Sequence, residues 1–250
     1  TADAAVVAAL ALLPPTAPLT AGEPTLVYWD ICGLGEAIRL ALAFSGGGFD
    51  DVRLDPGTPG EASYKCAWVA AKQSLGLRFP NLPYFLDGDI ALTQSNAILR
   101  HIGRTRAKLQ VDVSAATLAQ IDQALEQASD LDDVLTGACY RGGASAVTAA
   151  FESRLPSALA ELDRVLALNG GAGPFVAGSV VSIADFKIFE LLRKCRIAAS
   201  EVGLAEDPLA GLGALSGHVA AVAALPAVAA YIASPEYSSR PLNNPHAQLK

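Results

Sequence analysis

Two side chains suited to thiol chemistry, Tyr28 and Cys32, lie close together in the segment LVYWDICGLGEAIRL. The segment begins like a strand, turns at Gly33 and Gly35, and continues with the apolar spacing of a helix. A thiol near the start of a helix has a lowered pKa, so Cys32 is a candidate nucleophile. A strand tyrosine is more often a packing residue, although its hydroxyl can donate a hydrogen bond. The glycine turn would let a substrate approach both side chains.

Two further pairs of residues have spacings that suit an anionic ligand. Trp68 and Lys72 lie four residues apart on a predicted helix, and therefore on one face of it. Gln94 and Ser95 stand where another helix begins, with Ser95 as the predicted N-cap. Free N–H groups and the helix dipole favour a carboxylate there. Read alone, Lys72 equally fits a solvated surface and Ser95 an ordinary cap.

The elements that position these residues predict a small α/β domain over residues 25–108. Its order is βαβ followed by αββα. The predicted elements are strands at 25–31 and 49–54, a helix at 36–44, an amphipathic segment around Trp68, two strands joined by a turn at Asp87 and Gly88, and a helix from Ser95.

An all-helical domain is predicted for residues 109–250. Strand signals cease after about residue 109, and long apolar helical patterns follow. They cover 115–141, 146–168, 181–197 and 215–233. The chain therefore combines an α/β domain with an all-α domain.

Composition excludes several classes of function. A net charge of −7 and a pI near 4.9 argue against a nucleic-acid partner, which requires clustered Lys and Arg. The four cysteines, Cys32, Cys66, Cys139 and Cys195, have no metal-ligand spacing. We therefore expect no metal, and unpaired thiols of a reducing compartment.

Residues 1–24 form a separate N-terminal extension. The apolar run AAVVAALALL at 4–13 is too short to cross a bilayer, which needs about 20 residues. It resembles the apolar core of a targeting sequence, but Arg39 is the first basic residue of the chain. A residual extension and a short helix packed on the protein or on a partner both remain open.

Several longer motifs resemble the mu class of glutathione transferases. They are YWDICGLGEAIRL, SLGLRFPNLPYFLDG and LTQSNAILRHIGR, and FVAGSVVSIADF at 175–186 is similar to the family's helix-capping motif. The resemblance implies a thioredoxin-like domain joined to a helical domain. It also implies a detoxification enzyme that conjugates the thiolate of its co-substrate glutathione to hydrophobic electrophiles.

The resemblance also assigns roles to individual residues. It makes Tyr28 the donor of a hydrogen bond to the glutathione sulfur, which would favour the thiolate. Tyr140 would border the electrophile pocket, and Phe79 would insert into a second subunit of a homodimer. The Leu82–Pro83 peptide bond would be cis. The residues implied in glutathione binding are Trp29, Lys65, Trp68, Lys72, Asn81, Leu82, Pro83, Gln94, Ser95 and, from the neighbouring subunit, Asp130.

Two alternatives to conjugation stay open at this point. Cys32 stands where the mu class usually has arginine, so it could support thiol–disulfide exchange, although Gly33 replaces the proline typical of cysteine-type members. The protein could instead be a scaffold subunit, docked onto a larger assembly through residues 1–24. The family default is the cytoplasm, and an organelle such as a plastid or mitochondrion is the alternative.

Overall fold

A computed structural model describes residues 22–61, 64–107, 109, 113–168 and 173–249. Most of the predicted extension at 1–24 lies outside these residues, and so does most of the predicted boundary between the domains near residue 109. Both remain predictions.

The first half of the chain forms a four-stranded mixed sheet in the order β2-β1-β3-β4. β1 pairs in parallel with β2, and the β1–β3 and β3–β4 pairs are antiparallel. Every residue of β1 is buried because the strand lies between two neighbours. The strands are β1 (Thr25–Trp29), β2 (Asp50–Leu54), β3 (Tyr84–Asp87) and β4 (Ile90–Thr93).

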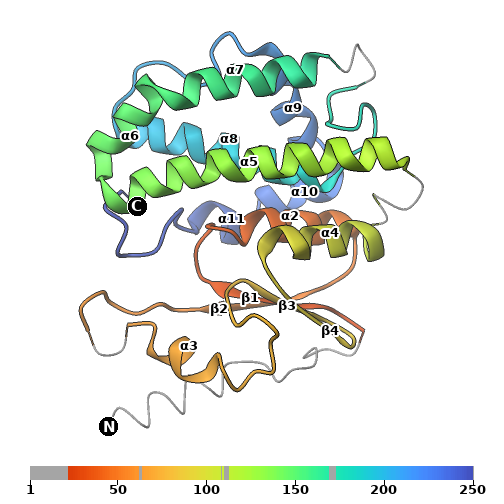
Figure 1. Cartoon of the computed structure of the whole chain (residues 1–250), viewed down its shortest axis with the longest axis vertical. Helices are drawn as coiled ribbons and strands as arrows, with labels where there is room; N and C mark the ends of the chain where they lie inside the picture. Colours follow the sequence, from red (N-terminus) through yellow and green to blue (C-terminus); the bar gives the residue numbers. More distant parts are fainter. Residues whose placement is uncertain (1–21, 62–63, 108, 110–112, 169–172, 250) are drawn as a thin grey trace.

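Helices cover both faces of this sheet (Figure 1). α2 (Glu36–Ser45) and α4 (Ser95–Thr105) lie between the sheet and the helical half of the molecule, whereas α3 (Cys66–Ala71) lies on the opposite face. The order β1-α2-β2-α3-β3-β4-α4 confirms the predicted βαβ-αββα domain.

The second half of the chain is helical, which confirms the predicted fold class. α8 is its central helix: it packs against α5 and also against α2, so its side chains reach the first domain. The helices are α5 (Ala115–Arg141), α6 (Gly143–Glu152), α7 (Arg154–Ala167), α8 (Ile183–Glu201), α9 (Gly213–Ala223), α10 (Pro226–Ile232) and α11 (Pro235–Ser239).

Two predicted helices are each divided in the structure. The 146–168 pattern breaks at Ser153, and Pro156 falls in the first turn of α7. The 215–233 pattern breaks before Pro226, which begins α10. Proline lacks an N–H, so it fits a first turn and interrupts a continuous helix. Periodicity alone does not detect such breaks, because the apolar spacing continues through them.

A capping box fixes the beginning of α8 inside the core. The Asp185 carboxylate accepts hydrogen bonds from the Ser182 N–H and hydroxyl, both at 2.7 Å, and from the Val176 N–H at 2.9 Å. Both side chains are fully buried. The motif therefore satisfies N–H groups at the start of the central helix.

Among the described residues, no single helix is long and apolar enough to cross a membrane. α9 and α10 meet the length and composition criteria only as a pair, and the pair is bent by 87°.

Candidate functional site

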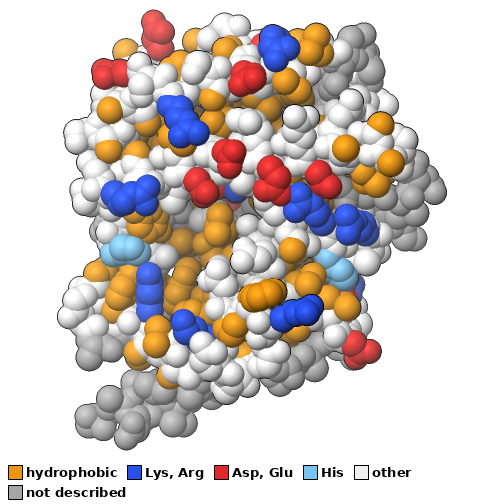
Figure 2. Space-filling model, viewed as in Figure 1, with side chains coloured by type: hydrophobic (Ala, Val, Ile, Leu, Met, Phe, Trp, Pro, Cys, Tyr) orange, Lys and Arg blue, Asp and Glu red, His pale blue; other side chains and the backbone are white. Residues whose placement is uncertain are grey.

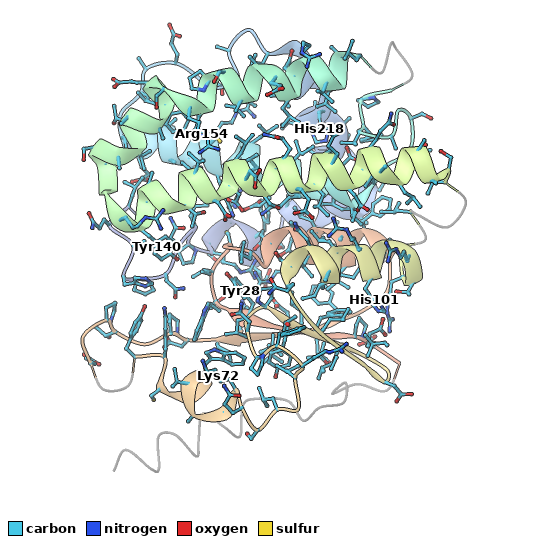
Figure 3. All side chains as sticks on the ribbon, in the orientation of Figure 1. Tyr28, Lys72, His101, Tyr140, Arg154 and His218 are labelled. Carbon is cyan, nitrogen blue, oxygen red and sulfur yellow. The ribbon has the colours of Figure 1, made fainter. Side chains whose placement is uncertain are left out.

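Tyr28 lies on β1 at the opening between the two domains (Figure 3). Its side chain is buried, and its hydroxyl oxygen accepts a hydrogen bond from the Leu34 N–H at 3.0 Å. A Cβ at Gly33 would lie 2.5 Å from the hydroxyl oxygen, and one at Gly35 would lie 2.6 Å from the ring. The two glycines therefore make room for the tyrosine, a role that the sequence did not predict.

Burial determines the acidity of Tyr28. It raises the pKa to about 12, although the Leu34 N–H and the positive charge of Lys194 oppose the shift. The hydroxyl thus keeps its proton at neutral pH. Because its oxygen already accepts a bond from Leu34, the O–H can donate to a neighbouring sulfur.

Cys32 has the environment of a core residue. Its sulfur is fully buried, donates to the Arg240 carbonyl at 3.4 Å and accepts from the Arg193 guanidinium at 3.3 Å. Burial raises the pKa of this thiol to about 12, and the carboxylates of Glu190 and Glu36 add to the shift. The proximity of α2 does not overcome these effects, so burial and charge argue against Cys32 as a nucleophile.

The α3 region brings several predicted ligand-binding residues together. Trp68 is buried and stacks on Tyr84, with ring centroids 6.1 Å apart. The Lys65 ammonium lies 5.9 Å from the centre of the Trp29 ring. Lys72 caps the C-terminal end of α3. Aromatic surface and cationic groups thus lie in one region.

The main chain just before β3 and the start of α4 form the next part of the site. The Leu82–Pro83 bond is cis, as the resemblance implies. The Leu82 N–H is held by the Asn81 side-chain oxygen at 2.9 Å. The predicted N-cap was wrong: Gln94, at φ +73°, precedes the first helical residue, Ser95. Among the described residues no side chain caps the start of α4, so its first turn is open to a carboxylate.

Residues 240–249 pass between the two domains and contact both. The Asn244 N–H donates to the Tyr140 hydroxyl at 2.8 Å. His246 packs edge-on against Tyr140 and shares a 2.5 Å hydrogen bond with the Tyr64 hydroxyl. Burial and the charge of Lys65 lower the pKa of His246. The sequence did not predict that Tyr64 and His246 border the opening, because their contact joins segments 182 residues apart.

Figure 2 shows apolar side chains in the hollow between the two domains, with basic side chains at its lower edge. This surface combines an apolar wall with cationic groups. Asp130 and Phe79 are both exposed, and Phe79 is 65 % exposed.

A buried cluster of charges adjoins Tyr28 from the helical domain. The Asp132 carboxylate bonds Lys187 at 2.5 Å and Lys194 at 3.0 Å. Lys194 also donates to the Gly33 carbonyl at 2.7 Å. The sequence analysis missed this cluster, although Lys187 and Lys194 are seven residues apart and share one face of α8.

Within the part of the chain that the structure describes, no group of three or more His, Cys, Asp and Glu side chains is arranged to hold a metal ion.

Comparison with family models gives two matches. Residues 24–104 match the model of the glutathione S-transferase N-terminal domain, and residues 130–235 match that of the C-terminal domain. Together the two models cover the sheet, α3 and most of the helical half of the molecule.

Relatives and solved structures give the same result. A glutathione S-transferase of Tyrophagus putrescentiae is 35% identical over 84% of this chain and 89% of its own length. Glutathione S-transferase Mu 2 of Rattus norvegicus is 32% identical over 87% of this chain and 94% of its own. The structure of the Onchocerca volvulus pi-class enzyme has a TM-score of 0.76 at 27% identity, covering 90% of this chain and all of that one.

Proposed function

Because the chain belongs to the glutathione S-transferase family, with glutathione as its co-substrate, we propose that Tyr28 is the residue that stabilises the glutathione thiolate. One observation carries this assignment. The Tyr28 oxygen accepts the Leu34 N–H inside the protein while its own proton remains available to a sulfur. The raised pKa keeps that proton in place at neutral pH.

The reaction that follows is a nucleophilic attack. Glutathione releases its thiol proton to solvent, and the thiolate receives the Tyr28 hydrogen bond. A sulfur electron pair then forms a bond to the electrophilic carbon. Where the electrophile carries a leaving group, that group departs with the electrons of its bond. The tyrosine keeps its proton throughout.

Ionisation supplies only part of the rate. Lowering the thiol pKa by about two units from a reference near 8.5 raises the thiolate fraction at neutral pH about 25-fold. A Brønsted slope near 0.4–0.5 removes roughly eightfold of this gain, because a less basic sulfur is a weaker nucleophile. The remaining acceleration requires that the electrophile be held beside the sulfur. We assign this task to the apolar hollow and to Tyr140.

The glutathione peptide itself fits the surface around β3. We assign its main chain to Leu82, Pro83 and Asn81, whose side-chain oxygen would release the Leu82 N–H to the ligand. The uncapped start of α4 at Gln94 and Ser95 suits the γ-glutamyl carboxylate. The glycyl carboxylate is assigned to the cationic and indole groups of Trp29, Lys65, Trp68 and Lys72.

The decisive experiment combines a glutathione titration with a conjugation assay that uses chlorodinitrobenzene. We expect Tyr28→Phe to bind glutathione nearly as well as the native protein and to lose about 10²-fold or more in kcat/KM. Tyr237→Phe is the matched control, because the Tyr237 hydroxyl is buried and has no hydrogen-bond partner within the described part of the chain. Native activity in Tyr28→Phe would contradict the role assigned to Tyr28. Absence of binding at millimolar glutathione would contradict the whole proposed function.

We further propose that two copies of the chain associate through Phe79. An aromatic side chain left 65 % exposed beside the glutathione surface is a suitable anchor for a partner subunit. Asp130 is exposed on α5 and would reach the partner's glutathione. Phe79→Ser should convert the dimer to a monomer in light scattering, whereas Val69→Ser, also at an exposed apolar residue, should not.

Detoxification in the cytoplasm is the biological role that we propose for this chemistry. The described cysteines are all free thiols, which suits a reducing compartment. Cell fractionation with an antibody to the protein tests the location, and recovery in a plastid or mitochondrial fraction would contradict it.

A further inference from the structure

A single peptide group joins Tyr28 to the helical domain. The N–H of the Gly33–Leu34 peptide donates a hydrogen bond to the Tyr28 hydroxyl at 3.0 Å. The carbonyl of the same peptide accepts a hydrogen bond from the Lys194 ammonium at 2.7 Å. The carbonyl and N–H of a trans peptide point in opposite directions. Lys194 and the tyrosine therefore lie at the two ends of one dipole.

Lys194 remains charged in the interior. Its side chain is only 7 % exposed, and burial by itself favours the neutral amine. The carboxylates of Asp132 and Glu190 outweigh burial and hold the pKa of Lys194 above its ordinary value. A permanent positive charge thus lies behind Tyr28, the proposed donor of a hydrogen bond to the thiolate.

We propose that Lys194 is a positioning residue that polarises the Tyr28 hydroxyl through the Gly33–Leu34 peptide and thereby stabilises the glutathione thiolate. This inference rests on the proposed role of Tyr28. Lys194 touches neither glutathione nor the electrophile in this scheme. It acts from α8, in the other domain, on a residue of β1.

Hydrogen-bond cooperativity supplies the physical reason. An ammonium on the carbonyl makes the N–H of the same peptide a stronger donor. A tyrosine oxygen that accepts a stronger bond becomes in turn a better donor through its own O–H. The positive charge also stabilises the anionic sulfur directly, and the low dielectric of the interior weakens this interaction less than water would.

Other titratable groups surround the same region and must be separated from the effect. The groups that face Lys194 or Tyr28 are Asp132, Cys139 and Tyr140 of α5, Lys187, Glu190 and Cys195 of α8, and Arg39 of α2. Burial raises the pKa of Glu190 to about 7, so this group titrates near neutral pH. The measurement must therefore report the sulfur itself.

Lys187 provides a matched control for Lys194. Both ammonium groups bond the Asp132 carboxylate. Among the described residues Lys187 bonds Asp132 only, whereas Lys194 also bonds the Gly33 carbonyl. Lys194→Met leaves Asp132 paired with Lys187, and Lys187→Met leaves it paired with Lys194. The two variants thus remove similar structural support, and only one removes the link to Tyr28.

The test is the titration of bound glutathione, followed by the ultraviolet absorbance of the thiolate, together with the pH profile of kcat/KM. In Lys194→Met we expect the thiol pKa to rise by about one unit, with kcat/KM about tenfold lower at acidic pH and close to native at alkaline pH. Lys187→Met should keep the native thiol pKa. Lys194→Gln, whose amide can still donate to the carbonyl, separates charge from hydrogen bonding.

The outcomes distinguish this inference from the proposed function. If native protein shows a lowered thiol pKa and Tyr28→Phe abolishes it, Tyr28 has its proposed role. An unchanged thiol pKa in folded Lys194→Met would then overturn the role of Lys194 alone. An unchanged pKa in Lys194→Gln beside a raised one in Lys194→Met would assign that role to the hydrogen bond and not to the charge. An equal shift in Lys187→Met would also overturn it, because general loss of the buried cluster would explain both.

Discussion

The two domains contribute to the site in different ways. The thioredoxin-like domain contributes main-chain groups and side chains that belong to local sequence motifs. Leu82 and Gln94 are examples. The helical domain contributes buried charge: Asp132 and Lys194 come together across 62 residues of sequence. The first domain shapes the binding surface, and the second sets the electrostatic field behind it.

This difference has a physical cause. Binding groups must remain accessible to a ligand, so they occupy loops and element ends. A buried charge must be paired where it lies, since an isolated one is strongly destabilising. The buried charges of the helical domain can therefore influence the chemistry only through a network that is complete in the folded protein.

Removal of the buried carboxylate should have the largest effect. Asp132→Ala leaves Lys187 and Lys194 without their shared partner, and we expect a loss of about 3–5 kcal/mol in the free energy of unfolding. Urea denaturation at neutral pH measures it. Asp133→Ala, at the exposed neighbour, should change stability by less than about 0.5 kcal/mol. Equal losses would show that the cluster is not a distinct source of stability.

The same carboxylate predicts a dependence of stability on pH. Burial opposes ionisation of Asp132, but Lys194 and Lys187 outweigh it and hold the pKa below its ordinary value. The contribution is therefore complete above the unfolded-state pKa near 3.9 and is lost as the pH falls toward the folded-state pKa. The stability gap between native protein and Asp132→Ala should be constant above about pH 5 and shrink below about pH 4.

The capping box of α8 should rank next. Asp185→Asn replaces a carboxylate oxygen that accepts hydrogen bonds from N–H groups by an amide nitrogen that is itself a donor. We expect a loss of about 2–3 kcal/mol in the free energy of unfolding. Urea denaturation tests this as well. Glu201→Gln, an exposed carboxylate at the other end of α8, should be nearly neutral. A small effect of Asp185→Asn would mean that the helix start tolerates an uncapped turn.

A substitution in the turn next to Tyr28 should affect activity and stability to different extents. Gly33→Ala places a Cβ 2.5 Å from the Tyr28 hydroxyl, so we expect about tenfold lower kcat/KM from displacement of the donor. Gly46→Ala is the control: its φ is also positive, at +75°, and open space surrounds it. Both variants should lose about 1 kcal/mol of stability from backbone strain. Equal activities would indicate that strain, and not contact with the tyrosine, matters.

The smallest effect concerns the cysteines. Cys32→Ala should leave conjugation within about twofold of native, because the buried thiol has a pKa near 12. In a time course of alkylation of native protein, Cys66, the only described cysteine that is partly exposed, should react first. Disulfide exchange that vanished in Cys32→Ala would restore the thiol chemistry that the sequence left open.

The sequence located the segments that border the opening better than the buried contacts behind them. The motif around Leu82 and Pro83 and the Tyr28 segment are local, so spacing and resemblance locate them. The Asp132–Lys194 contact depends on how α5 and α8 pack, and no local pattern records that packing. The helix breaks at Ser153 and Pro226 were also missed, because apolar periodicity continues across both of them.

The segment 240–249 has a consequence for the order in which the site forms during synthesis of the chain. The Pro241 and Leu242 carbonyls accept the Cys32 and Gly33 N–H groups, and the Asn244 N–H holds Tyr140. A ribosome-bound chain that has completed its sheet thus still lacks the strap that fixes the turn beside Tyr28. The turn beside Tyr28 therefore reaches its hydrogen-bonded form only after residues 240–249 have been translated and have folded against it.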